Sequence, residues 1–182
     1  GAAASCLAPD LYWRLDNNYH AAIGYRYDAA IMGWTVSQQD KTRSKRLQLL
    51  REAMAAAEFD GWIIGREDMY QGEEVPSGDE RLAYLSGFTG SAGFAVVLGD
   101  RAGLFSDGRY GLQMPAETNA ADWDCNISPD VTCEDWLKTV GLATGAVIAI
   151  DGRLVTVAGF RRFEKSVLAA GGTLVCHHEN LL

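Results

Sequence analysis

The order of apolar runs near the carboxyl end constrains the fold of this 182-residue chain more than any other feature. Residues 146–150 form a short apolar run, typical of a buried strand, and residues 173–176 form another after Gly171-Gly172. Between the two runs, apolar side chains recur at helical spacing, namely Phe160, Phe163, Val167 and Leu168. This order predicts a βαβ unit, whose two strands are parallel and whose crossover is right-handed.

A hairpin earlier in the chain adds antiparallel pairing. Residues 94–98 and 103–106 are strand-like and flank the turn Gly99-Asp100-Arg101. Residues 62–64 form an all-apolar run, which indicates a strand covered on both faces. Because parallel and antiparallel pairs must then share one sheet, we expect an α/β fold, a three-layer domain with a mixed β-sheet flanked by helices.

Two further segments have the signature of amphipathic helices. The first starts near Lys41 and ends before Asp60-Gly61, and its apolar face consists of Leu47, Leu50, Met54 and Ala57. The second follows Thr132 and Asp135, which have capping-box spacing, and ends at Gly141. Its apolar face consists of Trp136, Leu137 and Val140.

The segment between the first helix and the hairpin is expected to be irregular. Residues 66–80 are mostly polar and predict an exposed loop. Residues 84–86 look like a short strand that leads into a glycine-rich stretch. After the hairpin, Asp107-Gly108 is expected to turn the chain into a helix that starts near Tyr110.

The net charge and the lengths of the apolar runs exclude several classes of partner. A formal net charge of −8 disfavours nucleic acid and anionic membranes, because an acidic surface repels phosphate groups. No apolar run approaches the length that spans a bilayer, so we expect a soluble, cytoplasmic protein. The cysteines Cys6, Cys125, Cys133 and Cys176 form no CxxC pair, which favours reduced, mostly buried thiols, although a Cys125–Cys133 disulfide stays open.

Residues 1–36 differ from the rest of the chain, because their aromatic residues follow neither a helical nor a strand period. They are either a leader, native or introduced with the expressed sequence, or an arm that packs its aromatics on the domain or on a partner subunit.

The usual signatures of catalysis and ligand binding are incomplete. His177, His178 and Glu179 are adjacent ligand types, but neighbours on a strand point to opposite faces, which argues against a shared metal ion. Ser91 lies in Gly90-Ser91-Ala92-Gly93, which lacks the Gly-x-Ser-x-Gly spacing of a nucleophile elbow. The glycines Gly87, Gly90 and Gly93 match no phosphate-binding motif, and they favour a loop tucked against a neighbouring chain or domain.

Two charged positions near this loop remain as candidates. Asp107 is placed to cap the helix that follows it, and Arg109 is placed to bind a carboxylate with its guanidinium fork. Arg81 precedes the glycine-rich stretch, where it either forms a surface ion pair or meets a carbonyl or carboxylate of a peptide substrate.

Residues 84–93 and 106–110 together resemble the amino-terminal domain of Xaa-Pro aminopeptidases (aminopeptidase P), within the creatinase/prolidase group. The resemblance extends over residues 43–182 and is reinforced by Glu134-Asp135-Trp136-Leu137 and by Ile150-Asp151. It places residues 37–182 in a creatinase/prolidase-type domain with a mixed sheet, preceded by residues 1–36. The motif residues are then structural or interface positions, namely Gly87, Phe88, Gly90, Ser91, Gly93, Asp107, Arg109 and Tyr110.

The resemblance also implies that catalysis belongs to a separate carboxy-terminal "pita-bread" domain, where two Asp, one His and two Glu hold two divalent ions, usually manganese. Since the chain stops before such a domain, we expect no catalytic residue, metal ligand or cofactor within it and no hydrolysis by it alone. The implied partners are that catalytic domain, other copies in a homo-oligomer and a peptide substrate. The implied roles are oligomerisation and control of access to the active site, and Arg81 matches a substrate-proximal arginine of the family.

Two other functions remain compatible with these residues. One is a free-standing protein-binding or dimerisation module without peptidase activity, and the other is a nucleotide-binding α/β domain, for which the glycine spacing gives little support.

Overall fold

The computed structural model describes residues 36–182, and the unit considered below is Gln39–Leu182. The predicted leader, residues 1–36, falls outside the described residues except for its last position, as does Cys6.

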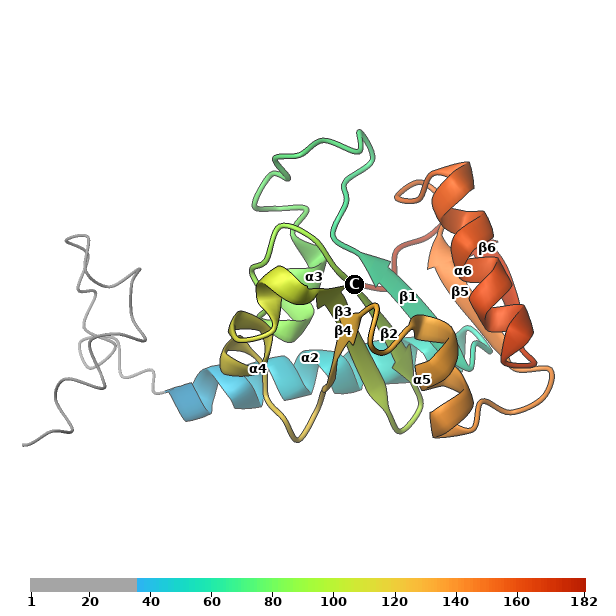
Figure 1. Cartoon of the computed structure of the whole chain (residues 1–182), viewed down its shortest axis with the longest axis horizontal. Coiled ribbons are helices and arrows are strands. Elements are labelled where there is room, and N and C mark those ends of the chain that lie inside the picture. Colours follow the sequence, from blue (N-terminus) through green and yellow to red (C-terminus); the bar gives the residue numbers. More distant parts are fainter. Residues whose placement is uncertain (1–35) are drawn as a thin grey trace, which may run out of the picture. The chain divides into compact units, whose positions relative to one another are not determined.

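A six-stranded mixed sheet lies at the centre of this unit, with strand order β4-β3-β2-β1-β5-β6 (Figure 1). Strand β2 is antiparallel to both of its neighbours, and every other pair is parallel. The five remaining strands therefore end at one edge, here named the carboxyl edge, and β2 begins there. The strands are β1 (Gly61–Gly65), β2 (Phe94–Leu98), β3 (Ala102–Asp107), β4 (Asp124–Ser128), β5 (Val147–Asp151) and β6 (Thr173–His177).

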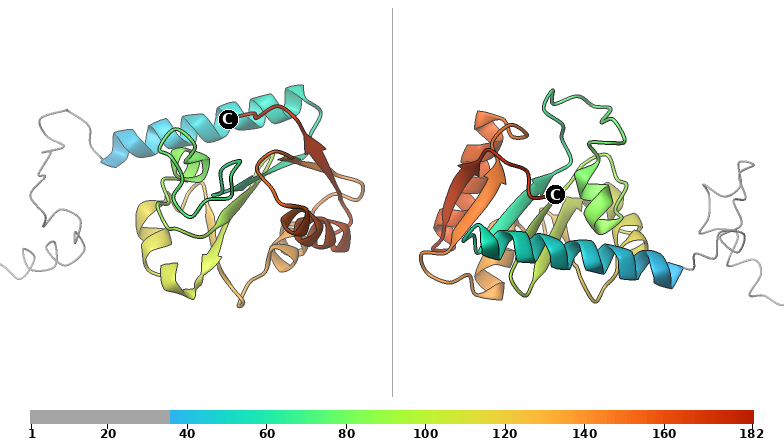
Figure 2. Two further views of the ribbon diagram at one scale, coloured as in Figure 1. Left: turned by 90° about the horizontal axis from the view of Figure 1, so that it is seen from above. Right: turned by 180° about the vertical axis from the view of Figure 1, so that it is seen from behind.

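Helices cover both faces of the sheet, which confirms the predicted three-layer α/β architecture. The long helix α2 runs across one face and α6 lies on the other (Figure 2). Helices α3 and α4 share the face of α2, and α5 shares the face of α6. The helices are α2 (Val36–Ala56), α3 (Arg81–Ser86), α4 (Gln113–Glu117), α5 (Cys133–Val140) and α6 (Val157–Ala169), with a 3-10 turn η1 (Gly108–Tyr110) before α4.

Each face of the sheet has its own hydrophobic core. Successive residues of β1 point to opposite faces, so Trp62 and Ile64 enter one core and Ile63 enters the other. The first core receives Leu47, Leu50 and Met54 of the predicted apolar face of α2, whereas Ala57 lies just beyond the end of that helix. The second core receives Trp136 of α5 and Phe163 of α6. The prediction that residues 62–64 form a strand buried on both faces is confirmed.

The predicted termini of α5 are also present. The Thr132 hydroxyl accepts the Asp135 backbone N–H at 3.2 Å, and the Thr132 N–H donates to the Asp135 carboxylate at 3.1 Å, which completes the capping box. Gly141 ends the helix in the left-handed conformation.

Three local expectations were wrong. Residues 84–86 belong to helix α3 rather than to a strand, because Leu82 and Leu85, one helical turn apart, both pack into the first core. Leu168 is half exposed, since Phe163 and Val167 already fill the sheet-facing side of α6. Asp107 leads into a 3-10 turn, and α4 begins only at Gln113.

Strand β4 is an element for which the sequence patterns gave no expectation. Every second residue of β4 is polar, and the strand is only five residues long. Parallel pairing with β3 and packing of Cys125 and Ile127 on the first core hold it in the sheet.

Gly87 provides a test of the packing after α3. Its φ of 88° is left-handed, and a Cβ there would lie 2.4 Å from the Arg43 guanidinium carbon. We expect Gly87→Ala to lower the free energy of unfolding by roughly 1–2 kcal/mol, measured by urea titration. The matched control is Gly99→Ala in the hairpin turn, where a Cβ meets nothing within 4 Å. Equal stability of the two variants would contradict this account of α3.

Candidate functional site

The carboxyl edge brings together most residues that sequence patterns singled out. Asp107 ends β3 and Asp151 ends β5, while the glycine-rich loop, residues 87–93, leads into the start of β2. Arg81 begins helix α3 at the end of the loop that follows β1. The reversed direction of β2 is the reason that a loop before a strand and the segments after strands meet at the same edge.

The glycine-rich loop is held by side chains on both sides. The hydroxyls of Ser91 and Tyr110 share a hydrogen bond of 2.6 Å, and the Ser91 N–H donates to the same phenol at 3.1 Å. The Thr89 N–H donates to the Glu117 carboxylate at 2.8 Å, and the Ser106 hydroxyl donates to the Ala92 carbonyl at 2.6 Å. Ser91 is thus bound to a phenol, which is a poor base at neutral pH, so it has no activated-nucleophile geometry.

The glycines of this loop are required by packing within the domain itself. A Cβ on Gly90 would lie 2.1 Å from the Phe88 ring, and one on Gly93 would lie 2.8 Å from the Phe105 carbonyl oxygen. The expected close backbone approach is therefore real, but the contacts are with this chain's own residues. This explains the spacing without a phosphate group.

Asp107 and Arg109 form a compact clip after β3. The Asp107 carboxylate accepts hydrogen bonds from the Arg109 N–H at 3.0 Å, from Nε at 2.9 Å and from Nη2 at 2.8 Å. These contacts confirm that Asp107 caps the following turn and that the Arg109 fork binds a carboxylate. The Arg109 hydrogen bonds also lower the pKa of Asp107.

An equivalent clip follows β5, and sequence reasoning missed it. Asp151 accepts hydrogen bonds from the Arg153 N–H at 3.0 Å, from Nε at 3.1 Å and from Nη2 at 2.9 Å. The sequence did contain a signal for this second clip, because Asp151-Gly152-Arg153 has the same sequence as Asp107-Gly108-Arg109. Strands β3 and β5 are thus each followed by the same hydrogen-bonded Asp-Gly-Arg turn.

The two clips differ in burial. The Asp107 side chain is 41% exposed, whereas that of Asp151 is 4% exposed. Burial raises the pKa of Asp151, but the hydrogen bonds from Arg153, together with the positive charges of Arg153 and Arg81, outweigh burial and hold that pKa below its ordinary value. Asp151 is therefore an ionised, paired carboxylate at neutral pH.

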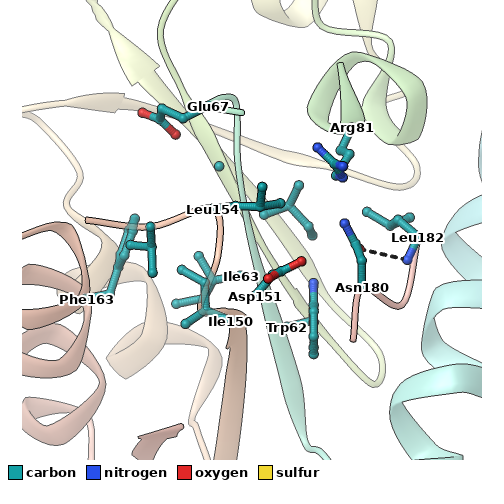
Figure 3. Close-up of a pocket in the computed structure, with 13 residues that line it drawn as sticks. Trp62, Ile63, Glu67, Arg81, Ile150, Asp151, Leu154, Phe163, Asn180 and Leu182 are labelled. Atoms are coloured by element: carbon teal, nitrogen blue, oxygen red, sulfur yellow. Dashed lines mark hydrogen bonds between the residues drawn. The ribbon is translucent and has the colours of Figure 1, made fainter. Parts of the chain in front are cut away.

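Arg81 and Asp151 line one small pocket at the carboxyl edge, which also contains Asn180 and Leu182 from the end of the chain (Figure 3). Arg81 projects toward the side formed by Asn180 and Leu182, with Phe163 on the opposite side. Its Nη2 also lies 2.8 Å from the Asp79 carboxylate, and Nη1 donates to the Asp79 carbonyl at 3.2 Å. Arg81 thus forms an ion pair within its own loop and lines a pocket at the same time.

A larger groove of about 600 Å³ lies beside this pocket, between the starts of α5 and α6. Its floor includes Phe94, which stacks on Phe105 at 4.7 Å and meets the edge of Phe163 at 4.9 Å between ring centroids. Asp107, Thr132 and Thr156 contribute polar groups to its rim.

Metal ligands do not gather in the described part of the chain. Across residues 36–182, no three His, Cys, Asp or Glu side chains are placed to hold a metal ion. The His177 ring instead packs edge-on against Phe59, with 5.1 Å between centroids, and against Trp62 at 5.9 Å. These residues do not fit a pair of divalent ions.

The disulfide left open by the sequence is not formed. Cys125, Cys133 and Cys176 are free, and Cys125 packs on the first core while Cys133 lies in the second, across the sheet. Burial raises the pKa of the Cys133 thiol to about 12, so it stays protonated and unreactive. Within residues 36–182, no helix combines the length and apolar character needed to cross a bilayer.

Comparison with known sequences gives a consistent result. Residues 46–179 match the family model of the creatinase/prolidase N-terminal domain. A probable Xaa-Pro aminopeptidase P of Arthroderma otae is 36% identical over 142 residues, which cover 76% of this chain and 22% of that protein. One from Aspergillus fumigatus is 30% identical over 159 residues, covering 86% and 24%. The chain thus spans less than a quarter of the length of these relatives.

Solved structures agree in fold. The X-prolyl aminopeptidase of Caenorhabditis elegans, described as a cytosolic enzyme with a di-nuclear active site, superposes with a TM-score of 0.68 at 30% identity. The match covers 77% of this chain and 25% of that enzyme. The N-terminal domain of the cytoplasmic peptidase PepQ from Mycobacterium tuberculosis superposes with a TM-score of 0.55 at 27% identity, covering 73% of this chain and 92% of that domain.

The paired clips allow a matched test of electrostatics. We expect Asp151→Asn to lower the free energy of unfolding at pH 7 by roughly 1–3 kcal/mol, because a buried hydrogen-bonded carboxylate is lost, and Asp107→Asn to have a smaller effect. Since the folded-state pKa of Asp151 is lowered, its stabilisation is complete above the ordinary aspartate pKa of about 4, and it is lost as the pH falls from there through the lower folded-state pKa.

The deficit of Asp151→Asn relative to the unsubstituted chain should therefore shrink below pH 4, as measured by urea titration between pH 3 and pH 7. A deficit that stays constant over this range would show that Asp151 does not contribute through its charge.

Proposed function

Because the chain belongs to the creatinase/prolidase N-terminal domain family, as an amino-terminal domain of aminopeptidase P-like proteins, we propose that it is the non-catalytic domain of an Xaa-Pro aminopeptidase-like metallopeptidase. The parent enzyme would remove the residue that precedes proline at peptide amino termini. The observation that carries this proposal is the match of residues 46–179 to an N-terminal domain in relatives about four times as long.

The catalytic metals of the parent would be held outside this chain. The C. elegans relative is described as an enzyme with a di-nuclear active site, and the matched region covers 25% of it. The ligand types in residues 36–182 do not cluster, so we assign two divalent ions, manganese by family resemblance, to the carboxy-terminal catalytic domain. That domain is the proposed principal partner of this chain.

Within the parent, this domain would assist oligomerisation and limit access to the active site to peptide ends. The carboxyl edge supports this role, because its turns are braced by the two Asp-Gly-Arg clips and by the Ser91–Tyr110 pair. A rigid edge can limit the width of the entrance to the active site, because its own loops do not move aside. The description of the C. elegans enzyme as cytosolic supports a cytoplasmic location.

Arg81 is the proposed substrate-proximal residue. Its side chain is 24% exposed and lines the pocket at the carboxyl edge, and the contacts with Asp79 fix its direction. A guanidinium held in this way retains donors that can meet a peptide carbonyl or carboxylate.

The absence of activity in the isolated domain is directly testable. We expect the 182-residue chain, supplied with manganese, to release no amino acid from an Xaa-Pro-Xaa peptide, because the catalytic ligands belong to the parent's other domain. The full-length parent, assayed in parallel by chromatography of the products, should cleave the peptide. Metal-dependent turnover by the isolated chain would overturn the proposal.

Arg81 is testable only in the full-length parent. We expect Arg81→Ala to raise KM or lower kcat about tenfold for Xaa-Pro peptides, the loss of one charged hydrogen bond, without changing the metal content measured by mass spectrometry. The control is Arg101→Ala, which removes a surface ion pair with Asp124 at the β2–β3 turn, at the opposite edge of the sheet. Unchanged kinetics for Arg81→Ala would leave Arg81 as a surface ion-pair residue.

A further inference from the structure

The loop between β1 and α3, residues 66–80 and here named the docking loop, presents two large apolar side chains to solvent. Met69 is 60% exposed and Tyr70 is 81% exposed. The loop leaves the end of β1 and projects beyond the carboxyl edge of the sheet (Figure 1). The two residues are consecutive in the sequence, and both lie on this projecting loop.

The backbone that carries these side chains is held by a buried carboxylate. Asp68 is 3% exposed, and its Oδ1 accepts the Tyr70 N–H at 2.9 Å and the Gly72 N–H at 3.2 Å. Because both N–H groups converge on one oxygen, the chain turns tightly and directs Met69 and Tyr70 outward.

A second element holds the turn on the domain. Gln71 has a φ of 57°, a left-handed conformation that is uncommon for residues other than glycine. Its side-chain amide donates to the Asp68 carbonyl at 2.9 Å and to the Leu154 carbonyl at 3.1 Å, which ties the docking loop to the segment after β5. At the base of the loop, Arg66 donates to the Glu73 carbonyl at 3.0 Å.

A loop that only connects β1 to α3 requires neither a buried carboxylate nor a left-handed glutamine. The left-handed conformation of Gln71 costs free energy, and it keeps in place a backbone whose most exposed side chains, Met69 and Tyr70, lie outside this domain's core. A preformed loop loses little conformational entropy on binding, which favours association through the side chains it presents. The geometry therefore matches a contact surface for another protein domain.

The position of the chain end identifies the occupant. Leu182 lines the small pocket together with Gly65, Glu67 and Leu154, so the chain leaves the domain beside the base of the docking loop (Figure 3). In the relatives, about three quarters of the length lies outside the matched N-terminal region. A domain that follows Leu182 starts next to this loop.

We propose that the docking loop binds the domain that follows Leu182 in the same polypeptide, with Met69 and Tyr70 as its buried contacts. This inference rests on the proposed function. The matching surface on that following domain is an apolar pocket that accepts both side chains and offers a hydrogen-bond acceptor to the Tyr70 hydroxyl.

The direct test places a photoreactive p-benzoylphenylalanine at position 70 of the full-length parent. Illumination should join position 70 to residues beyond Leu182 of the same polypeptide, as shown by an unchanged monomer mass and by peptide mapping. The control carries the same probe at Leu168, which is 57% exposed near the end of α6, remote from the carboxyl edge, and should give no such product. A cross-link between two copies, or none at position 70, would overturn the proposal.

A second measurement uses Met69→Ser combined with Tyr70→Ser. The isolated 182-residue chain should keep its Tm within about 1 °C, since neither side chain contributes to its core. In the full-length parent, the melting transition of this domain should fall by roughly 5 °C, and Leu168→Ser should not reproduce the shift. An unchanged transition in a parent that still cleaves Xaa-Pro peptides would refute docking alone, whereas a parent inactive on such peptides would refute the proposed function.

Discussion

The reversal of strand β2 is the constraint on which the arrangement of this domain depends. Because β2 is antiparallel to β1 and β3, those two strands run in the same direction without a crossover helix between them. The other parallel strands, β4, β5 and β6, share that direction, so five strand ends and the start of β2 meet at the carboxyl edge. Every candidate residue discussed for function lies on or beside a segment that enters or leaves this edge.

Short polar contacts stiffen the carboxyl edge. The Asp-Gly-Arg clips brace the turns after β3 and β5, Asp68 braces the turn after β1, and the Ser91–Tyr110 pair holds the loop before β2. Each contact satisfies backbone N–H groups that a loop leaves unpaired. Such an edge presents a surface of fixed form.

Much of the fold was predictable, because its signals are local. The βαβ unit, the capping box at Thr132 and the β2–β3 hairpin follow from the periodicity and turn chemistry of nearby residues. Strand β4 was not predictable in the same way, because three of its five residues are polar and only its partner strand β3 selects the extended form. Helix α3 was missed because six residues contain too few repeats to separate a helical period from a strand.

By itself, the sequence determined the α/β class, the caps and turns, and the motifs at residues 84–93 and 106–110 that identify the family. These depend on neighbours within a few positions, where backbone geometry links residue type directly to conformation. Only the tertiary structure decided that Arg81 and Asp151 share a pocket, that the glycines pack against their own chain, and that Asp68 is buried beneath an exposed Tyr70. These contacts depend on the order and direction of the strands. They join residues that are far apart in the chain, so no local sequence pattern predicts them.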